Sequence, residues 1–221
     1  MVDGPPGGFG VQRNPSTTGL SMVIARSTTW WIVWAGVAVE ALRRSEAARQ
    51  VRLAGGSWYP HWRYEMEDGL VAVTGSVFAM EAITRQLTQV DKIVDPQARA
   101  RWAKQKKDAA WRTREVLKRC IRGGEGQQLG DQWKPLINRR NGVVHFVAEQ
   151  RPSVPYDGMN IAVEDAEFTA VEAARAVDLL FTTLEGLGTR SKPAVQGHAA
   201  GFSGQLEELR ERRRVGGVPT M

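Results

Sequence analysis

Residues 129–147 of this 221-residue chain read LGDQWKPLINRRNGVVHFV, and apolar side chains recur in them three or four positions apart. Those positions are Leu129, Trp133, Leu136, Ile137, Val144 and Val147. Such spacing is typical of a helix that packs one face on a core. Arg140 falls on that face, where a cation is costly unless it is paired. The stretch therefore predicts a core helix whose arginine is held for either a carboxylate or a ligand.

The same helix carries the residues that we predict to be catalytic, Arg140, Asn141 and His145. An arginine can hold a phosphate through two parallel hydrogen bonds, and an ordinary histidine, with a pKa of about 6.5, can transfer a proton at neutral pH. Asn141 and His145 are four positions apart and share one side of the helix, whereas Arg140 is rotated from His145 by about 140°. A common phosphate site therefore requires a bend near Gly142 or a second copy of the motif from a partner subunit.

Two other segments carry a helical apolar stripe. Residues 66–90 predict the first core helix of a bundle. Residues 164–187 predict the closing helix, started by Glu164 and Asp165, whose charge suits a helix N-terminus. The link at 150–160 is too rich in proline and glycine to be helical. These segments together predict an all-α bundle.

Glu81 lies one residue away from the apolar stripe of the segment 66–90. A carboxylate at such a position is usually at the surface. The alternative is a supporting role in the site, in which Glu81 pairs with Arg140 or orients His145 across the helix interface. Both interpretations stay open at the level of sequence.

The segment from Pro96 to Arg122 contains ten lysine and arginine residues against two acidic residues. We expect one amphipathic helix here, starting after the N-cap Asp95, with a basic outer side. Its inner face consists of Trp102, Val116, Leu117 and Cys120. The basic side is either a solvated surface or a track for an RNA backbone, because phosphate contacts supply most nonspecific affinity. The candidate RNA-binding residues are Arg101, Lys104, Lys107, Arg114 and Lys118.

The chain resembles the HEPN (higher eukaryotes and prokaryotes nucleotide-binding) domain family. Its signature is an arginine followed four to six residues later by a histidine, often with a polar residue directly after the arginine. Arg140, Asn141 and His145 match this signature, and the order of expected helices from Tyr64 to Leu187 matches the antiparallel bundle of the family. The resemblance implies a homodimer in which two motifs form one composite cleft.

This resemblance also implies an activity. Many members are metal-independent endoribonucleases that use no cofactor, and some are toxins or defence effectors with a regulatory protein partner. The expected partner is RNA. The alternative is a catalytically silent HEPN-like module that binds a nucleotide or a protein through the same groove, and a purely structural dimer scaffold is a third possibility.

Composition restricts the other classes of function. A hydrophobic fraction of 42% is that of a globular protein, and a net charge of +6 favours polyanionic partners. The single cysteine, Cys120, rules out an intramolecular disulfide and favours a reducing compartment such as the cytoplasm. No His-x-x-x-His or Cys-x-x-Cys spacing predicts a metal site. The glycines at 123–130 lack the Gly-Lys-Ser/Thr that completes a P-loop, so we interpret them as a hinge between two helices.

The chain is expected to divide into four parts along its length. They are a flexible N-terminal segment at 1–27, an accessory helix at 28–54 capped by Ser27 or Thr28, a HEPN-like helical domain at 62–188, and a flexible tail at 189–221 with a short charged helix at 204–214. The accessory helix has only about ten uncharged residues before Glu40, too few to cross a bilayer. We expect it to pack an aromatic face on the bundle or on the other subunit.

Overall fold

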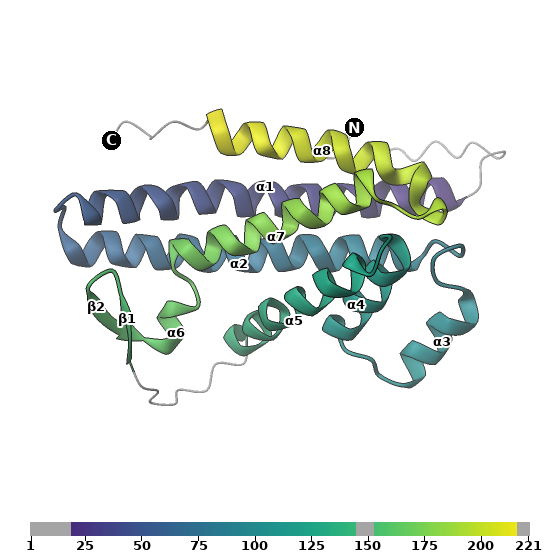
Figure 1. Cartoon of the computed structure of the whole chain (residues 1–221), viewed down its shortest axis with the longest axis horizontal. Helices are drawn as coiled ribbons and strands as arrows, with labels where there is room; N and C mark the ends of the chain where they lie inside the picture. Colours follow the sequence, from purple (N-terminus) through teal and green to yellow (C-terminus); the bar gives the residue numbers. More distant parts are fainter. Residues whose placement is uncertain (1–18, 145–152, 216–221) are drawn as a thin grey trace, which may run out of the picture.

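The computed structural model describes residues 19–144 and 153–215, and helices make up most of them (Figure 1). The all-α prediction is confirmed, with one small hairpin added. The elements are α1 Gly19–Leu53, α2 Trp58–Thr88, α3 Pro96–Lys104, α4 Ala109–Cys120, α5 Glu125–Val144, β1 Ser153–Tyr156, β2 Met159–Ala162, α6 Val163–Ala166, α7 Ala170–Thr189, the 3-10 helix η1 Pro193–Val195, and α8 Gln196–Val215.

Helices α1 and α2 run antiparallel along each other and form the axis of the molecule (Figure 1). The two backbones come close where small residues of the two helices meet. A Cβ atom at Gly75 would lie 3.2 Å from both the Cβ of Ala38 and the carbonyl oxygen of Trp34. Helix α1 is therefore part of the core rather than an accessory. Alanines carry a weak apolar signal, which is why the sequence understated this helix.

The bounds of α1 and α2 also differ from those predicted. Helix α1 begins at Gly19, so Ser27 and Thr28 lie inside it and are not N-caps. Of the segment predicted to be flexible, residues 1–18 lie outside the described part of the chain and residues 19–27 belong to α1. Helix α2 starts at Trp58 rather than at residue 66. No helix in the described ranges is both long and apolar enough to traverse a bilayer.

The predicted helix at 96–122 is wrong as a single element. It divides into α3 and α4, because Lys106 has a left-handed backbone with a φ of 50° and Asp108 starts a new helix by accepting a 2.7 Å hydrogen bond from the Trp111 amide. The N-cap at Asp95 is confirmed by a 2.8 Å bond from the Ala98 amide. The predicted inner face is also confirmed, since Trp102, Val116, Leu117 and Cys120 are all buried.

Helices α4 and α5 form a tight antiparallel pair. Gly123 and Gly124, with φ of 68° and 78°, make the turn between them, as the hinge interpretation predicted. Gly126 and Gly130 lie inside α5 instead and let the two helices touch. A Cβ at Gly126 would lie 2.1 Å from the carbonyl oxygen of Leu117. On the inner side of α5, the predicted core residues Leu129, Trp133, Leu136 and Ile137 are buried.

The described part of the link, 153–160, is not helical, as predicted, but it belongs to the antiparallel hairpin β1–β2, which was not anticipated. Asp157 and Gly158 form its two-residue turn with φ of 47° and 81°. An Asp-Gly pair with two positive φ angles is the favoured chemistry for such a turn. The closing helix α7 starts after Thr169, whose hydroxyl accepts from the Glu172 amide at 3.3 Å. The acids predicted to start it belong to the separate short helix α6.

Helix α8 is longer than the predicted helix at 204–214 and packs on α1 and α7. Phe202, Leu206 and Leu209 are buried, and the Phe202 ring lies 5.7 Å from that of Trp31. Three apolar residues in two turns make a weak apolar stripe, so the sequence predicted a flexible tail with only a short helix. The helix instead completes the bundle.

Candidate functional site

Arg140 projects from α5 toward α2 and is partly buried, with 17% of its side chain exposed. Its Nη2 donates a hydrogen bond to Oε1 of Glu81 in an ion pair. The guanidinium carbon lies 5.3 Å from the centre of the Phe78 ring, within the range of a cation–π contact. The Nε of Arg140 is buried and has no hydrogen-bond partner among the described residues. One carboxylate and one aromatic face thus hold this cation with part of its donor capacity unused.

Glu81 is the residue for which the sequence left two interpretations. The structure has the ion pair with Arg140, so Glu81 is not a solvated surface carboxylate. Burial raises the pKa of Glu81 because it disfavours the charged form, and the positive charges of Arg140 and Arg85 offset part of that effect. The carboxyl group is therefore more readily protonated than an ordinary glutamate.

The rest of the motif is only partly described. Asn141 is exposed, and α5 continues without interruption through Gly142 to Val144. His145 lies outside the described residues, as does Val147. A helix break at Gly142, one of the two arrangements expected from the sequence, is absent from the described part of α5.

The candidate RNA-binding residues lie on α3, α4 and the link between them rather than along one helix. Arg101, Lys104 and Lys118 are exposed and form no ion pair with the described residues. The Lys107 Nζ lies 5.0 Å from the centre of the Trp111 ring. Arg114 differs from the others because its Nε bonds Asp131 at 2.7 Å, which neutralises much of its charge.

A groove of about 740 Å³ lies between α1, α2 and the start of α4. The aromatic residues Trp30, Trp34 and Phe78 line it together with the cations Arg85, Lys107 and Arg112. Sequence reasoning missed this groove and assigned the tryptophans to an accessory helix. Trp30 and Trp34 are four apart, and Phe78 and Arg85 are seven apart, so each pair shares a helix face. This spacing is the feature of the sequence from which the groove could have been predicted.

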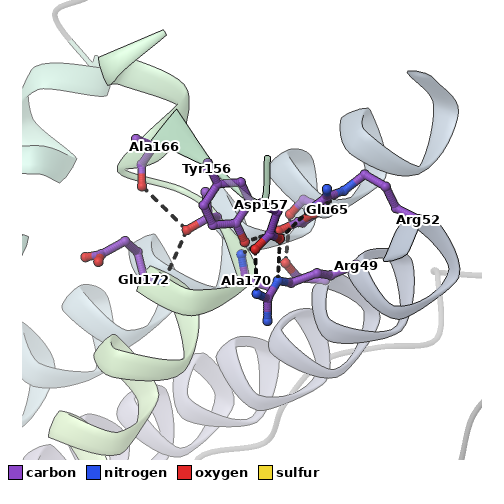
Figure 2. A network of polar contacts seen from close by, with 10 residues as sticks. Arg49, Arg52, Glu65, Tyr156, Asp157, Ala166, Ala170 and Glu172 are labelled. Carbon is purple, nitrogen blue, oxygen red and sulfur yellow. Dashed lines mark hydrogen bonds and ion pairs between the residues drawn. The ribbon is translucent and has the colours of Figure 1, made fainter. Parts of the chain in front are cut away.

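A second polar cluster, at the opposite end of α2, has a different character (Figure 2). Glu65 is fully buried, and both of its carboxylate oxygens are satisfied. Oε2 accepts from Arg52 Nε at 3.2 Å and Nη2 at 2.9 Å. Oε1 accepts from the Tyr156 hydroxyl at 2.7 Å and from the Ala170 amide at 3.2 Å. The cluster therefore ties α1, α2, the hairpin and α7 together.

Asp157 closes this cluster from the turn of the hairpin. It accepts two hydrogen bonds of 2.9 Å from Arg49 and one of 2.8 Å from Arg52. The two Arg49 hydrogen bonds, with the one from Arg52, lower the pKa of Asp157. Burial and the hydrogen bond to Glu65 raise the pKa of Tyr156. Since none of its buried side-chain nitrogen or oxygen atoms lacks a hydrogen-bond partner, the cluster is suited to fixing the hairpin rather than to binding a ligand.

Two other kinds of chemistry find little support in the described ranges. No group of three histidine, cysteine, aspartate or glutamate side chains there is placed to hold a metal ion. Burial raises the pKa of the Cys120 thiol to about 12, which keeps it protonated and poorly nucleophilic at neutral pH.

No protein-family model, curated protein or solved structure matches the chain.

Proposed function

We propose that the chain is a metal-independent endoribonuclease of the HEPN type, acting as a homodimer on RNA. The observation that carries the proposal is the setting of Arg140, a partly buried cation with an unused buried N–H, five positions before His145. On the strength of the resemblance, we further propose a cytoplasmic toxin or defence effector controlled by a protein partner.

The contacts of Arg140 suit a group that stabilises charge on a phosphate. Glu81 and Phe78 fix the guanidinium, so little side-chain entropy remains to be lost when a ligand binds. A hydrogen-bond donor that is held in place and partly shielded from water stabilises the charge of a transition state more than a donor in bulk water does. Glu81 acts here as a positioning residue, because it holds the arginine and takes no part in bond making.

The proposed reaction is a transesterification. The ribose 2′-oxygen forms a bond to phosphorus, and the bond between phosphorus and the 5′-oxygen breaks. His145 accepts the proton of the 2′-hydroxyl or donates a proton to the departing 5′-oxygen, water carries out the other proton transfer, and Arg140 stabilises the charge on the phosphoryl oxygens. Asn141 positions the histidine or the phosphate. The products are a 2′,3′-cyclic phosphate and a 5′-hydroxyl, so DNA is not cut.

The proposal is tested by incubating the full chain with a mixed RNA pool in the presence of EDTA. Arg140→Ala and His145→Ala are each expected to lower cleavage by about 10²-fold or more, since each removes a charge stabiliser or a proton-transfer group. Arg139→Ala is the matched control, because Arg139 neighbours Arg140 but pairs with Glu172 at 2.7 Å. That variant should cleave like the parent.

The Arg140→Ala protein is expected to stay folded, since 26% of the Glu81 side chain is exposed and water can solvate this carboxylate when its partner is removed. Circular dichroism measures whether the Arg140→Ala protein keeps its helical content, and sedimentation measures whether it keeps its oligomeric state. Equal cleavage by the parent, Arg140→Ala and His145→Ala would show that the site is assigned wrongly.

The composite arrangement has a separate test. With α5 unbroken at Gly142, the rotation of about 140° that the sequence spacing predicts between Arg140 and His145 favours a site shared by two chains. Mixing inactive Arg140→Ala with inactive His145→Ala protein should restore part of the cleavage, because each heterodimer keeps one arginine and one histidine in the cleft. A monomer that cleaves at every concentration would contradict the shared site.

A catalytically silent module that binds a nucleotide or a protein is the second candidate. The ion pair itself favours it, because Glu81 already occupies part of the Arg140 guanidinium. Nucleotide binding by a parent protein that cuts no RNA would support this alternative over the nuclease.

A further inference from the structure

The groove between α1, α2 and α4 has an aromatic wall that is open to a ligand. Trp30 is 61% exposed. Trp34 lies four residues further along α1, and its ring packs 4.8 Å from that of Phe78. An exposed indole backed by a second aromatic pair offers a flat face on which a planar group can stack.

The two arginines of the groove are not used by the fold. Arg85 and Arg112 are exposed and form no ion pair with the described residues, and Lys107 also lines the groove. The acid in the lining is Glu81, which is already paired with Arg140. The groove therefore carries uncompensated positive charge beside its aromatic wall, and this combination is complementary to an anion with planar rings.

The groove also leads to the proposed catalytic residue. Two of its lining residues, Phe78 and Glu81, are the residues that contact the Arg140 guanidinium. A polyanion bound along the groove would thus have one end beside Arg140.

We propose that this groove binds a segment of single-stranded RNA, with a base stacked on Trp30 and phosphates contacting Arg85 and Arg112. The inference rests on the proposed nuclease function and supplies its substrate class. Bases within a duplex are already stacked and their faces are hidden, whereas unpaired bases can splay onto an aromatic side chain. The groove would therefore select unpaired RNA and direct a phosphodiester toward Arg140.

Binding is measured by fluorescence anisotropy, with a labelled oligouridylate of about twelve nucleotides, a length within the usual range of single-strand sites. All variants carry His145→Ala so that the probe stays intact. Trp30→Ala should weaken binding about tenfold, the typical loss for one stacked base. Arg85→Gln with Arg112→Gln should flatten the dependence of log affinity on log salt by about 0.7 for each lost phosphate contact. An RNA duplex of equal length should bind equally to the parent and to Trp30→Ala.

The matched controls are Tyr59→Ala and Arg63→Gln at the other end of α2. Tyr59 is 67% exposed, and Arg63 lies about 30 Å along the helix from Arg85 at 1.5 Å per residue. Neither control should change affinity or salt dependence. Both groove variants are at exposed positions, and their circular dichroism spectra should match the parent's.

Unchanged oligouridylate binding in both groove variants would overturn the inference. So would a Trp30→Ala protein that sediments as a monomer where the parent is a dimer, since the tryptophan face would then be a subunit contact. Failure of the nuclease proposal gives a different result. In that case the parent leaves RNA uncut while Trp30→Ala still weakens binding.

Discussion

The two ends of α2 differ in whether the nearby arginines are paired with carboxylates. At the hairpin end, Arg49 and Arg52 are enclosed by Glu65, Tyr156 and Asp157, and every carboxylate oxygen of Glu65 has a donor. At the groove end, around Phe78 to Gln89, Glu81 pairs with Arg140, but the exposed Arg85 and Arg112 form no ion pair with the described residues. The difference indicates that the hairpin cluster serves the fold, whereas the groove cations are available for a ligand.

The largest effect on stability is expected from removing the buried carboxylate at the hairpin end. Glu65→Ala leaves Arg52 buried without its main partner, so the free energy of unfolding should fall by about 3–5 kcal/mol. Urea denaturation measures the loss. Glu67→Ala is the control, because the pair of Glu67 with Arg63 is exposed to solvent and should contribute little. Similar small losses in both variants would mean that the cluster is not structural.

A smaller effect is expected at Asp157, and it depends on pH. Because its folded pKa is lowered, Asp157 stabilises the protein above its unfolded pKa of about 3.9, and this contribution is lost as pH falls through the folded pKa. Asp157→Asn should therefore cost about 1–2 kcal/mol at pH 7 and nothing in strong acid. Asparagine tolerates the positive φ at this position.

Urea denaturation at a series of pH values follows the difference between Asp157→Asn and the parent. Asp91→Asn is the control, since the exposed pair of Asp91 with Arg99 should contribute little at any pH. A pH-independent loss in Asp157→Asn would point to altered backbone geometry instead of lost charge.

The smallest effect is expected at the groove end. Arg85→Gln with Arg112→Gln should change the free energy of unfolding by no more than about 0.5 kcal/mol, since neither side chain has a carboxylate partner among the described residues. The matched change at the hairpin end, Arg49→Gln, should cost more than about 1 kcal/mol because it removes two hydrogen bonds to Asp157. Thermal or urea unfolding of both variants sharpens the comparison. A large loss in the groove variant would assign these cations to the fold.

Much of the fold could be predicted wherever apolar spacing was strong over several turns. The buried stripe of Leu129, Trp133 and Ile137 is such a case. The break at Lys106 could not be predicted, because it consists of one residue in a left-handed conformation within a chain of good helix formers. Helix α8 was underestimated for a related reason, since its stripe is short and gains its burial from α1 and α7.

The candidate site shows the same limit. Arg140 was recognisable as a cation on an apolar face, and Glu81 was one of its possible partners. Whether Glu81 pairs with Arg140 or faces solvent depends on how α2 packs on α5. The Glu65 cluster left no local signal at all, because its partner Ala170 is 105 positions away. Contacts between distant residues depend on topology, which single-sequence spacing does not contain.

The separation of these partners along the chain has a kinetic consequence. Helices α1 and α2 are joined by a link of only a few residues between Leu53 and Trp58, so the contacts nearest this link close short loops and are expected to form early. The bonds of Glu65 to Tyr156 and Ala170 close loops of 91 and 105 residues and are expected to form late, after the folding transition state. The hydrogen bonds of the hairpin cluster would then be broken before the unfolding transition state is reached, so they slow unfolding of the native protein. Their loss should appear mainly as faster unfolding, with little change in the rate of folding.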